Sequence, residues 1–140
     1  KTNVQRYELA PGLTISRVLT GLWQIADMER DGRKLDLSAT AKAMEPYVEA
    51  GLTTFDMADH YGSAEEIAGI FAQEYGRDAV QLFTKWVPKP GPASREDVRA
   101  AIQRALDRLR SEGKLAEQPE WRRWKTYSRS RGTPALAASI

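Results

Sequence analysis

The stretch Gly51-Leu-Thr-Thr-Phe-Asp56-Met-Ala-Asp-His-Tyr61-Gly-Ser-Ala-Glu65-Glu-Ile-Ala-Gly69 decides the fold of this chain. It opens with a short apolar run that ends at Asp56, and a helical pattern of apolar residues follows from Ser63. A second apolar run, residues 80–84, stops immediately before Lys85. This order of strand, helix and strand is typical of a parallel sheet. It places a carboxylate, a phenol and an amine at the ends of two predicted strands.

These three side chains are suited to donating a proton. A phenol ionises only near a pH of ~10 in water, but a neighbouring ammonium group favours its ionised form. Lys85 can supply that positive charge to Tyr61. Asp56 can hold Lys85 protonated and directed at the phenol. The stretch therefore predicts a general acid adjusted toward neutral pH.

Around this stretch the chain alternates between strand and helix patterns. Buried strands are predicted at residues 18–22, 53–56 and 80–84, and helices at 36–50, 63–75 and 94–109. Before them, two short runs flank Pro11-Gly12, which is a pair suited to a tight turn, so an antiparallel hairpin is expected there. The sequence thus predicts an α/β fold with one hairpin and about three strand–helix units.

The ends of the expected helices carry recognisable signals. Asp36 or Ser38 can cap a single helix that runs to Ala50. Ser63 with Glu66 fits a capping box, and Gly76 ends that helix. Ser94 with Asp97 begins the third helix in the same way. The predicted inward faces are Ile67, Ile70 and Phe71 in the second helix, and Val98, Ile102, Ala105, Leu106 and Leu109 in the third.

Composition excludes several classes of protein. A chain of 140 residues with 41% hydrophobic content has the size and core of one domain. Its 21 basic and 19 acidic residues leave a formal charge of +2, which does not point to nucleic acid or to a membrane surface. No apolar run approaches the ~18 residues of a membrane span. The absence of cysteine fits a reducing compartment, so a cytoplasmic location is expected.

The character of the sequence changes after Leu109, which divides it into residues 1–109 and a tail of residues 110–140. The tail mixes basic and aromatic side chains: Trp121, Arg122, Arg123, Trp124, Lys125, Tyr127, Arg129 and Arg131. Such a mixture can stack on bases and neutralise phosphates. Because no nucleic-acid-binding motif accompanies it, we instead expect a solvated segment and no nucleic-acid partner.

No fourth strand is expected in the tail, so the edge of the third strand is predicted to be open. An open strand edge invites pairing with another chain, so self-association is also expected. The sequence has no Cys/His cluster with metal-ligand spacing and no Gly-rich nucleotide loop of the common types. No bound metal is therefore expected.

The residues resemble the first signature of the aldo-keto reductase family: a glycine followed by Asp56, Ala58, Tyr61, Glu65 and Gly69 at the family's spacing. Gly21-Leu22-Trp23 at the end of the first strand and Lys85 at the end of the third strengthen the resemblance, which covers about residues 4–109. It implies a (β/α)8 TIM barrel with its active site at the carboxyl ends of the strands. This chain would be a truncated, partial form of that barrel, with the hairpin at its bottom.

The resemblance also implies a reaction, in which a hydride passes from NADPH, or less often NADH, to a small carbonyl substrate. The reverse reaction would oxidise an alcohol. Tyr61 then matches the acid that protonates the carbonyl oxygen, while Lys85 and Asp56 match its two partners, and Asp56 also lies near the nicotinamide ribose. Gly21, Leu22 and Trp23 match the segment beside the cofactor, and Trp86 is expected on the pocket wall.

Two departures from the family pattern leave an alternative open. The family's fourth catalytic residue, a histidine after the fourth strand, has no counterpart, because the only histidine is His60, beside Tyr61. A substitute role for His60 is one interpretation. The last strands of the barrel, which carry most cofactor contacts in the family, are also missing. The competing hypothesis is therefore a non-catalytic, truncated product that acts through protein–protein association.

Overall fold

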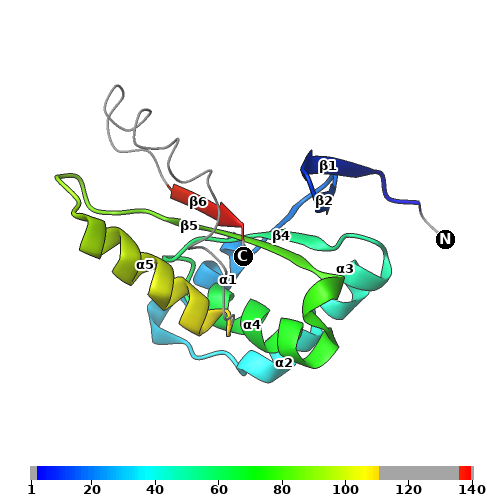
Figure 1. Cartoon of the computed structure of the whole chain (residues 1–140). Coiled ribbons are helices and arrows are strands. Elements are labelled where there is room, and N and C mark those ends of the chain that lie inside the picture. Colours follow the sequence, from blue (N-terminus) through cyan, green and yellow to red (C-terminus); the bar gives the residue numbers. More distant parts are fainter. Residues whose placement is uncertain (1–2, 111–135, 140) are drawn as a thin grey trace.

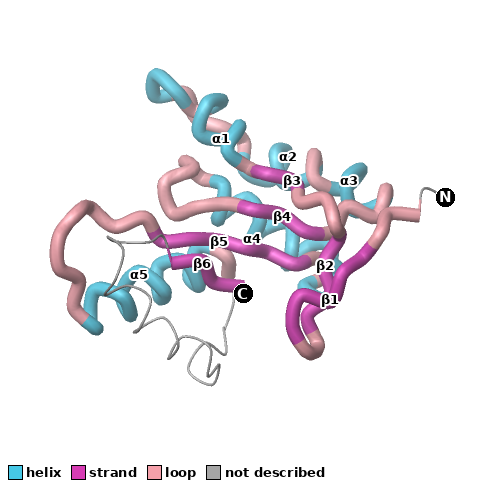
Figure 2. Tube along the Cα trace, turned by 90° about the horizontal axis from the view of Figure 1, so that it is seen from above, coloured by secondary structure: helices cyan, strands magenta, loops and turns pink. Residues whose placement is uncertain are grey.

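The computed structural model describes residues 3–110 and 136–139 (Figure 1). Its central feature is a sheet of four short strands in the order β3-β4-β5-β6, seen side by side in Figure 2. Strands β3 (Thr20–Gly21), β4 (Thr54–Asp56) and β5 (Gln81–Trp86) are parallel to one another. Strand β6 (Leu136–Ser139) runs antiparallel to β5. The expected parallel sheet is therefore present, with one antiparallel addition.

A separate hairpin lies at the end of the sheet where β4 and β5 begin (Figure 2). It consists of β1 (Arg6–Ala10) and β2 (Leu13–Ser16), and Gly12 in its turn has a φ of 77°. Ser16 and Thr54 exchange two bonds: the Ser16 N–H donates to Thr54 Oγ1 at 2.9 Å, and the Thr54 N–H donates to Ser16 Oγ at 3.2 Å. The predicted hairpin is confirmed, and it is attached to the amino ends of the strands.

Helices connect the strands and cover one side of the sheet. The longer ones are α4 (Ala64–Tyr75) and α5 (Arg95–Arg108), and together with α2 (Leu37–Lys42) they lie below β4 and β5 in Figure 1. The shorter ones are α1 (Trp23–Met28), α3 (Glu45–Glu49) and the 3-10 turns η1 (Arg30–Gly32) and η2 (Arg77–Ala79). None of the helices in the described part is long and apolar enough to cross a membrane.

The hydrophobic core fills the layer between these helices and the sheet. Phe55 of β4 and Leu82 of β5 point into it and are at most 1% exposed. Helix α4 contributes its whole inner face, including the predicted residues Ile67, Ile70 and Phe71. Of the predicted face of α5, Ala105 and Leu106 are buried, as is Leu109 just after its end, whereas Val98 and Ile102 are only half-buried.

Three local predictions are wrong for identifiable reasons. The helix expected from Asp36 to Ala50 is interrupted at Ala43 and Met44, and it restarts at α3 with Pro46 in the first turn. Proline has no N–H to donate to the carbonyl four residues earlier, so it favours the first turn of a new helix over the interior of a longer one. The first strand is limited to β3, and Val18 is 61% exposed. Ser63 makes no side-chain cap, because its hydroxyl instead bonds to Glu29.

The expected open edge of the third strand is also wrong. Residues 136–139 lie beside β5 with Lys85 opposite Ala137 and Trp86 opposite Leu136. An antiparallel segment can satisfy the same edge N–H and C=O groups that a parallel strand would. The basic and aromatic residues of the predicted tail, Trp121 to Arg131, lie outside the described residues. Within the described part the fold is α/β with a partial sheet and no closed barrel, as the sequence predicted.

Candidate active site

An ion pair joins the carboxyl ends of β4 and β5. Lys85 Nζ lies 3.1 Å and 2.9 Å from the two carboxylate oxygens of Asp56, and it also donates to the carbonyl oxygen of Met57 at 2.7 Å. The two residues are neighbours because Asp56 pairs with Phe83 across the ladder, two positions before Lys85. Residues two apart on a strand share a face of the sheet. The sequence prediction that Asp56 and Lys85 meet is therefore confirmed.

Tyr61 lies next to this ion pair. The centroid of its ring is 5.0 Å from Lys85 Nζ, and the ring is partly buried against the core. The turn that carries Tyr61 is fixed to the end of β5, since the Met57 N–H donates to Phe83 O at 2.8 Å and the Asp59 N–H donates to Lys85 O at 3.0 Å. The structure thus brings together the carboxylate, the amine and the phenol that the sequence singled out.

The end of β3 forms the other side of this group. The Leu22 N–H donates to the backbone oxygen of Asp56 at 2.8 Å, so β3 follows β4 to its last residue. Trp23 begins α1 there, and its ring centroid is 5.8 Å from that of Tyr61. The Trp23 side chain is 53% exposed, while Leu22 is buried. Of the predicted segment, Trp23 and Gly21 are accessible at the site, and Leu22 belongs to the core.

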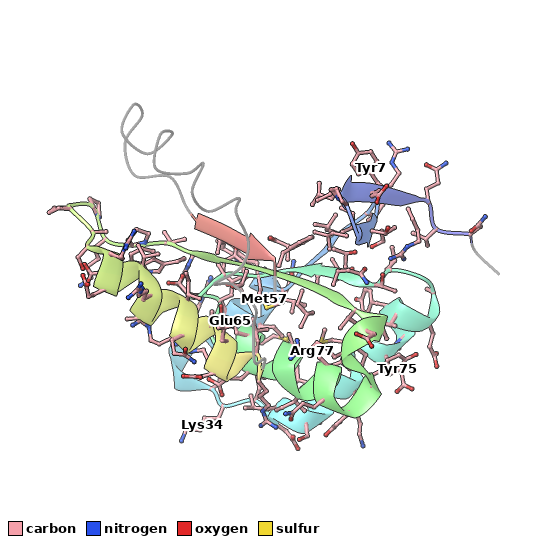
Figure 3. All side chains as sticks on the ribbon, viewed as in Figure 1. Tyr7, Lys34, Met57, Glu65, Tyr75 and Arg77 are labelled. Atoms are coloured by element: carbon pink, nitrogen blue, oxygen red, sulfur yellow. The ribbon has the colours of Figure 1, made fainter. Side chains whose placement is uncertain are left out.

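Two other residues of the signature stretch lie on the opposite side of the sheet, among the helices. Glu65 is 2% exposed and accepts a hydrogen bond from Thr84 Oγ1 at 2.5 Å. It also forms an ion pair with Arg108 at 3.1 Å. Figure 3 shows Glu65 in the layer between the sheet and the helices. Gly69 lies under the end of α5, where an added Cβ would be 2.5 Å from the backbone oxygen of Arg108. These two residues therefore hold α4, α5 and β5 together.

Two further candidate residues stand apart from the group of Asp56, Tyr61 and Lys85. His60 lies at the edge of this group, and Trp86 lies outside it. His60 is exposed, and its Nδ1 lies 3.2 Å from Asp59 Oδ1, while its ring meets the edge of Tyr61 at 4.9 Å between centroids. Trp86 lines a hollow of about 360 Å³ between the loop after β5 and α5, with Pro88, Pro92 and Arg104 among its neighbours. That hollow does not include Tyr61. Trp86 follows Lys85 directly and so points to the other face of the strand.

The fit of this site to a cofactor can be tested on its open surfaces. Asp56 keeps 42% of its side chain exposed although both of its oxygens contact Lys85. A Cβ placed on Gly21 would meet nothing within 4 Å, so there is free space above the end of β3. Together with the exposed ring of Trp23, these features fit the nicotinamide and ribose end of a dinucleotide. Among the described residues, no group of His, Cys, Asp and Glu side chains could hold a metal ion.

Comparison with known proteins gives one consistent result. Residues 17–113 match the model of the aldo/keto reductase family. The chain is 36% identical over 86 residues to a 6-dehydroglucose reductase of Agrobacterium fabrum, a match covering 59% of this chain and 28% of the relative. It is 35% identical over 86 residues to the uncharacterized oxidoreductase YcsN of Bacillus subtilis, covering 59% and 27%. The matched region thus spans less than a third of either relative's length.

Solved structures show the same fold. The thermostable aldo-keto reductase Tm1743, solved with the inhibitor epalrestat, superposes with a TM-score of 0.64 and 22% identity, over 77% of this chain and 39% of that protein. A Bombyx mori aldo-keto reductase in complex with NADP gives a TM-score of 0.53 and 23% identity, over 78% and 35%. At these identities the likeness concerns the fold alone. It agrees with the partial barrel predicted from the sequence.

Proposed function

Because the chain belongs to the aldo-keto reductase family, we propose that it carries the proton-donating half of an NAD(P)H-dependent oxidoreductase that reduces an aldehyde or ketone to an alcohol. The observation that carries this proposal is the position of Lys85. Its ammonium group is held by Asp56 and Met57 and lies 5.0 Å from the ring of Tyr61. A fixed cation beside a phenol stabilises the negative charge that the phenol acquires when it gives up its proton.

Tyr61 acts as the acid in this proposal. When the carbonyl carbon accepts a hydride, its oxygen gains an electron pair and takes the proton of the Tyr61 hydroxyl, which leaves a phenolate and a neutral alcohol. The Lys85 ammonium stabilises the phenolate by its charge, and this help is available without reorganisation because the amine is already fixed. Asp56 holds the Lys85 ammonium in place. In the reverse direction the phenolate takes the proton back from the alcohol.

The proposed cofactor contacts lie at the ends of β3 and β4. When bound, NADPH would supply the hydride. Asp56 would accept a hydrogen bond from a ribose hydroxyl, and the free space above Gly21 would allow close approach of the cofactor to the backbone. Trp23 would offer its exposed ring as a flat wall beside the nicotinamide and the substrate.

Cofactor titration tests the binding part of the proposal. NADPH added to the protein should quench tryptophan fluorescence, and it should raise the midpoint of thermal unfolding, because a ligand that binds only the folded state stabilises it. Trp23→Phe should remove part of the quenching, since the Trp23 ring lies 5.8 Å from the ring of Tyr61. Titration with neither quenching nor stabilisation would refute NADPH binding by this chain.

Replacement of the acid tests the chemical part. Tyr61→Phe keeps the ring and its contact with Trp23 but removes the proton donor. Reduction of an aromatic aldehyde by NADPH should then fall by at least about a hundredfold, while the affinity for NADPH stays nearly unchanged. An unaltered rate would remove Tyr61 from the mechanism.

A second candidate function is association with another chain, and the edge of β3 favours it. Within the described part, β3 pairs only with β4, and the exposed apolar residues Val18, Leu19 and Trp23 surround it. The free edge of a strand presents unpaired backbone N–H and C=O groups, so the edge of β3 can pair with a strand of another chain. Light scattering after size exclusion should then show a dimer that Leu19→Asp disrupts. A wild-type monomer at micromolar concentration would contradict this candidate.

A further inference from the structure

Glu29 bridges two parts of the site that are far apart in the sequence. It follows α1, and its carboxylate accepts the backbone N–H of Ser63 at 3.0 Å and the hydroxyl of the same serine. Ser63 is the first residue before α4 and lies two positions after Tyr61. The contact therefore fixes the turn that carries the phenol from the side of α1.

The backbone at this turn is shaped around the Glu29 carboxylate. Gly62, between Tyr61 and Ser63, has a φ of 53°, and a Cβ placed on it would lie only 3.1 to 3.2 Å from the carboxylate atoms of Glu29. Glycine is the residue that adopts this backbone conformation at little cost and also leaves room for close approach. The carboxylate thus lies directly against the turn.

The charge of Glu29 suits its position. The amino end of a helix presents unpaired N–H groups and a partial positive charge, so a carboxylate is favourable there. Ser63 makes no side-chain cap for α4, and Glu29, from a distant part of the chain, accepts the Ser63 N–H that Glu66 would accept in a capping box. Residue spacing could not reveal this pairing, because the two partners are separated by 34 positions.

The same segment contacts Tyr61 a second time. Trp23, at the start of α1, places its ring 5.8 Å from the ring of Tyr61. Residues 23–29 therefore hold the turn at two points, through the ring contact of Trp23 and through the Ser63 contact of Glu29. Lys85 Nζ lies 5.0 Å from the same Tyr61 ring.

We propose that Glu29 is a positioning residue for Tyr61. Its carboxylate fastens the turn of residues 61–63 to the end of α1, and thereby holds the phenol at its distance from Lys85. This inference deepens the proposed function and rests on Tyr61 being the acid. The contacts of Glu29 are with Ser63 and with the space beside Gly62, two positions and one position after Tyr61. Its effect on the reaction is therefore on the rate of proton transfer rather than on cofactor binding.

Steady-state kinetics test the inference. Glu29→Ala should lower kcat for aldehyde reduction by about tenfold or more, since misplacing a reacting group by an ångström can cost up to about a hundredfold. The KM for NADPH should stay within about twofold of the wild-type value. Glu29→Gln keeps an acceptor for the Ser63 N–H and should restore part of the rate. The matched control is Glu66→Ala, which removes an exposed carboxylate from the first turn of α4, the helix that follows Ser63.

A second measurement does not depend on activity. The five tyrosines can be labelled with 3-fluorotyrosine, and the Tyr61 signal is the one that Tyr61→Phe removes from the fluorine NMR spectrum. Glu29→Ala should shift or broaden that signal, whereas Glu66→Ala should leave it in place. Because this readout needs no cofactor, it separates a failure of the positioning role from a failure of the proposed function. A folded Glu29→Ala protein with an unmoved Tyr61 signal, or with an unchanged kcat in an active enzyme, would overturn the inference.

Discussion

The two faces of the sheet differ in what they bury. On the helix side, Phe55 and Leu82 are at most 1% exposed, and even the polar pair Glu65 and Thr84 is almost fully enclosed. On the other side, the side chains of Asp56 and Lys85 remain 42% and 24% exposed. Neighbouring residues of the same strands therefore meet very different surroundings. One face holds the elements together, and the other leaves Asp56 and Lys85 accessible at the carboxyl ends of the strands.

The comparison teaches that one stretch of sequence serves both faces. Glu65 and Gly69 join α4 to α5 and to β5, whereas Asp56 and Tyr61 lie with Lys85 on the accessible side. Substitutions on the helix side should therefore change stability, and substitutions on the accessible side should change the reaction. Each prediction below tests one side of this division.

The largest effect on stability is expected from Arg108→Met. It leaves the Glu65 carboxylate enclosed with the Thr84 hydroxyl as its remaining side-chain partner, and an unpaired buried charge is costly. Because Arg108 is itself 38% exposed, we expect a loss of about 3 kcal/mol in the free energy of unfolding, at the lower end for broken buried pairs. Urea denaturation measures it, with Arg104→Met on the same helix as control. If the two variants are equally stable, the ion pair of Arg108 with Glu65 does not stabilise the fold.

A smaller loss is expected from Gly69→Ala. The new Cβ would lie 2.5 Å from the backbone oxygen of Arg108, so the end of α5 must move. Overpacking of this kind costs about 1–3 kcal/mol, of which the helix propensity of alanine returns about 1 kcal/mol. Gly21→Ala is the matched variant on the accessible side, where a Cβ meets nothing within 4 Å. Unfolding curves should show a loss for the first variant only, and a loss for Gly21→Ala alone would reverse the comparison.

The smallest effect belongs to the exposed start of α5. There the Ser94 backbone N–H donates to Asp97, with a second contribution from the Ser94 side chain, and these bonds hold the pKa of the Asp97 carboxyl below its ordinary value of 3.8. The resulting stabilisation is fully present above that value and is lost as the pH falls through the lower, folded-state pKa. An NMR titration of the Asp97 carboxyl should give a midpoint below 3.8. A midpoint at or above 3.8 would show that Asp97 makes no such contribution to stability.

The sequence predicted the parts of the fold that depend on local patterns. The hairpin turn at Pro11-Gly12, the capping box of Ser94 with Asp97 and the inner face of α4 all follow from residues close together in the chain. The meeting of Asp56 with Lys85 was predictable too, because parallel strands bring their carboxyl ends to one edge.

Two of the features that sequence reasoning missed depend on distant partners. Ser63 with Glu66 has the pattern of a capping box, but a carboxylate 34 positions away replaces it. Residues 136–139 have no strand pattern strong enough to predict their place beside β5. Trp86 was expected at the pocket and instead points toward α5, because it directly follows Lys85 on a strand. The first two features carry no local signal, whereas the alternation of side chains along β5 could have placed Trp86.

Lys85→Met tests the division between the two faces most directly. The ion pair of Lys85 with Asp56 is partly exposed, so its loss should cost no more than about 1 kcal/mol of stability. The rate of aldehyde reduction by NADPH in a single turnover should nevertheless fall by about a hundredfold or more, because Tyr61 loses the charge beside it. A variant that reduces the aldehyde at the wild-type rate, or that loses stability as Arg108→Met does, would contradict the account.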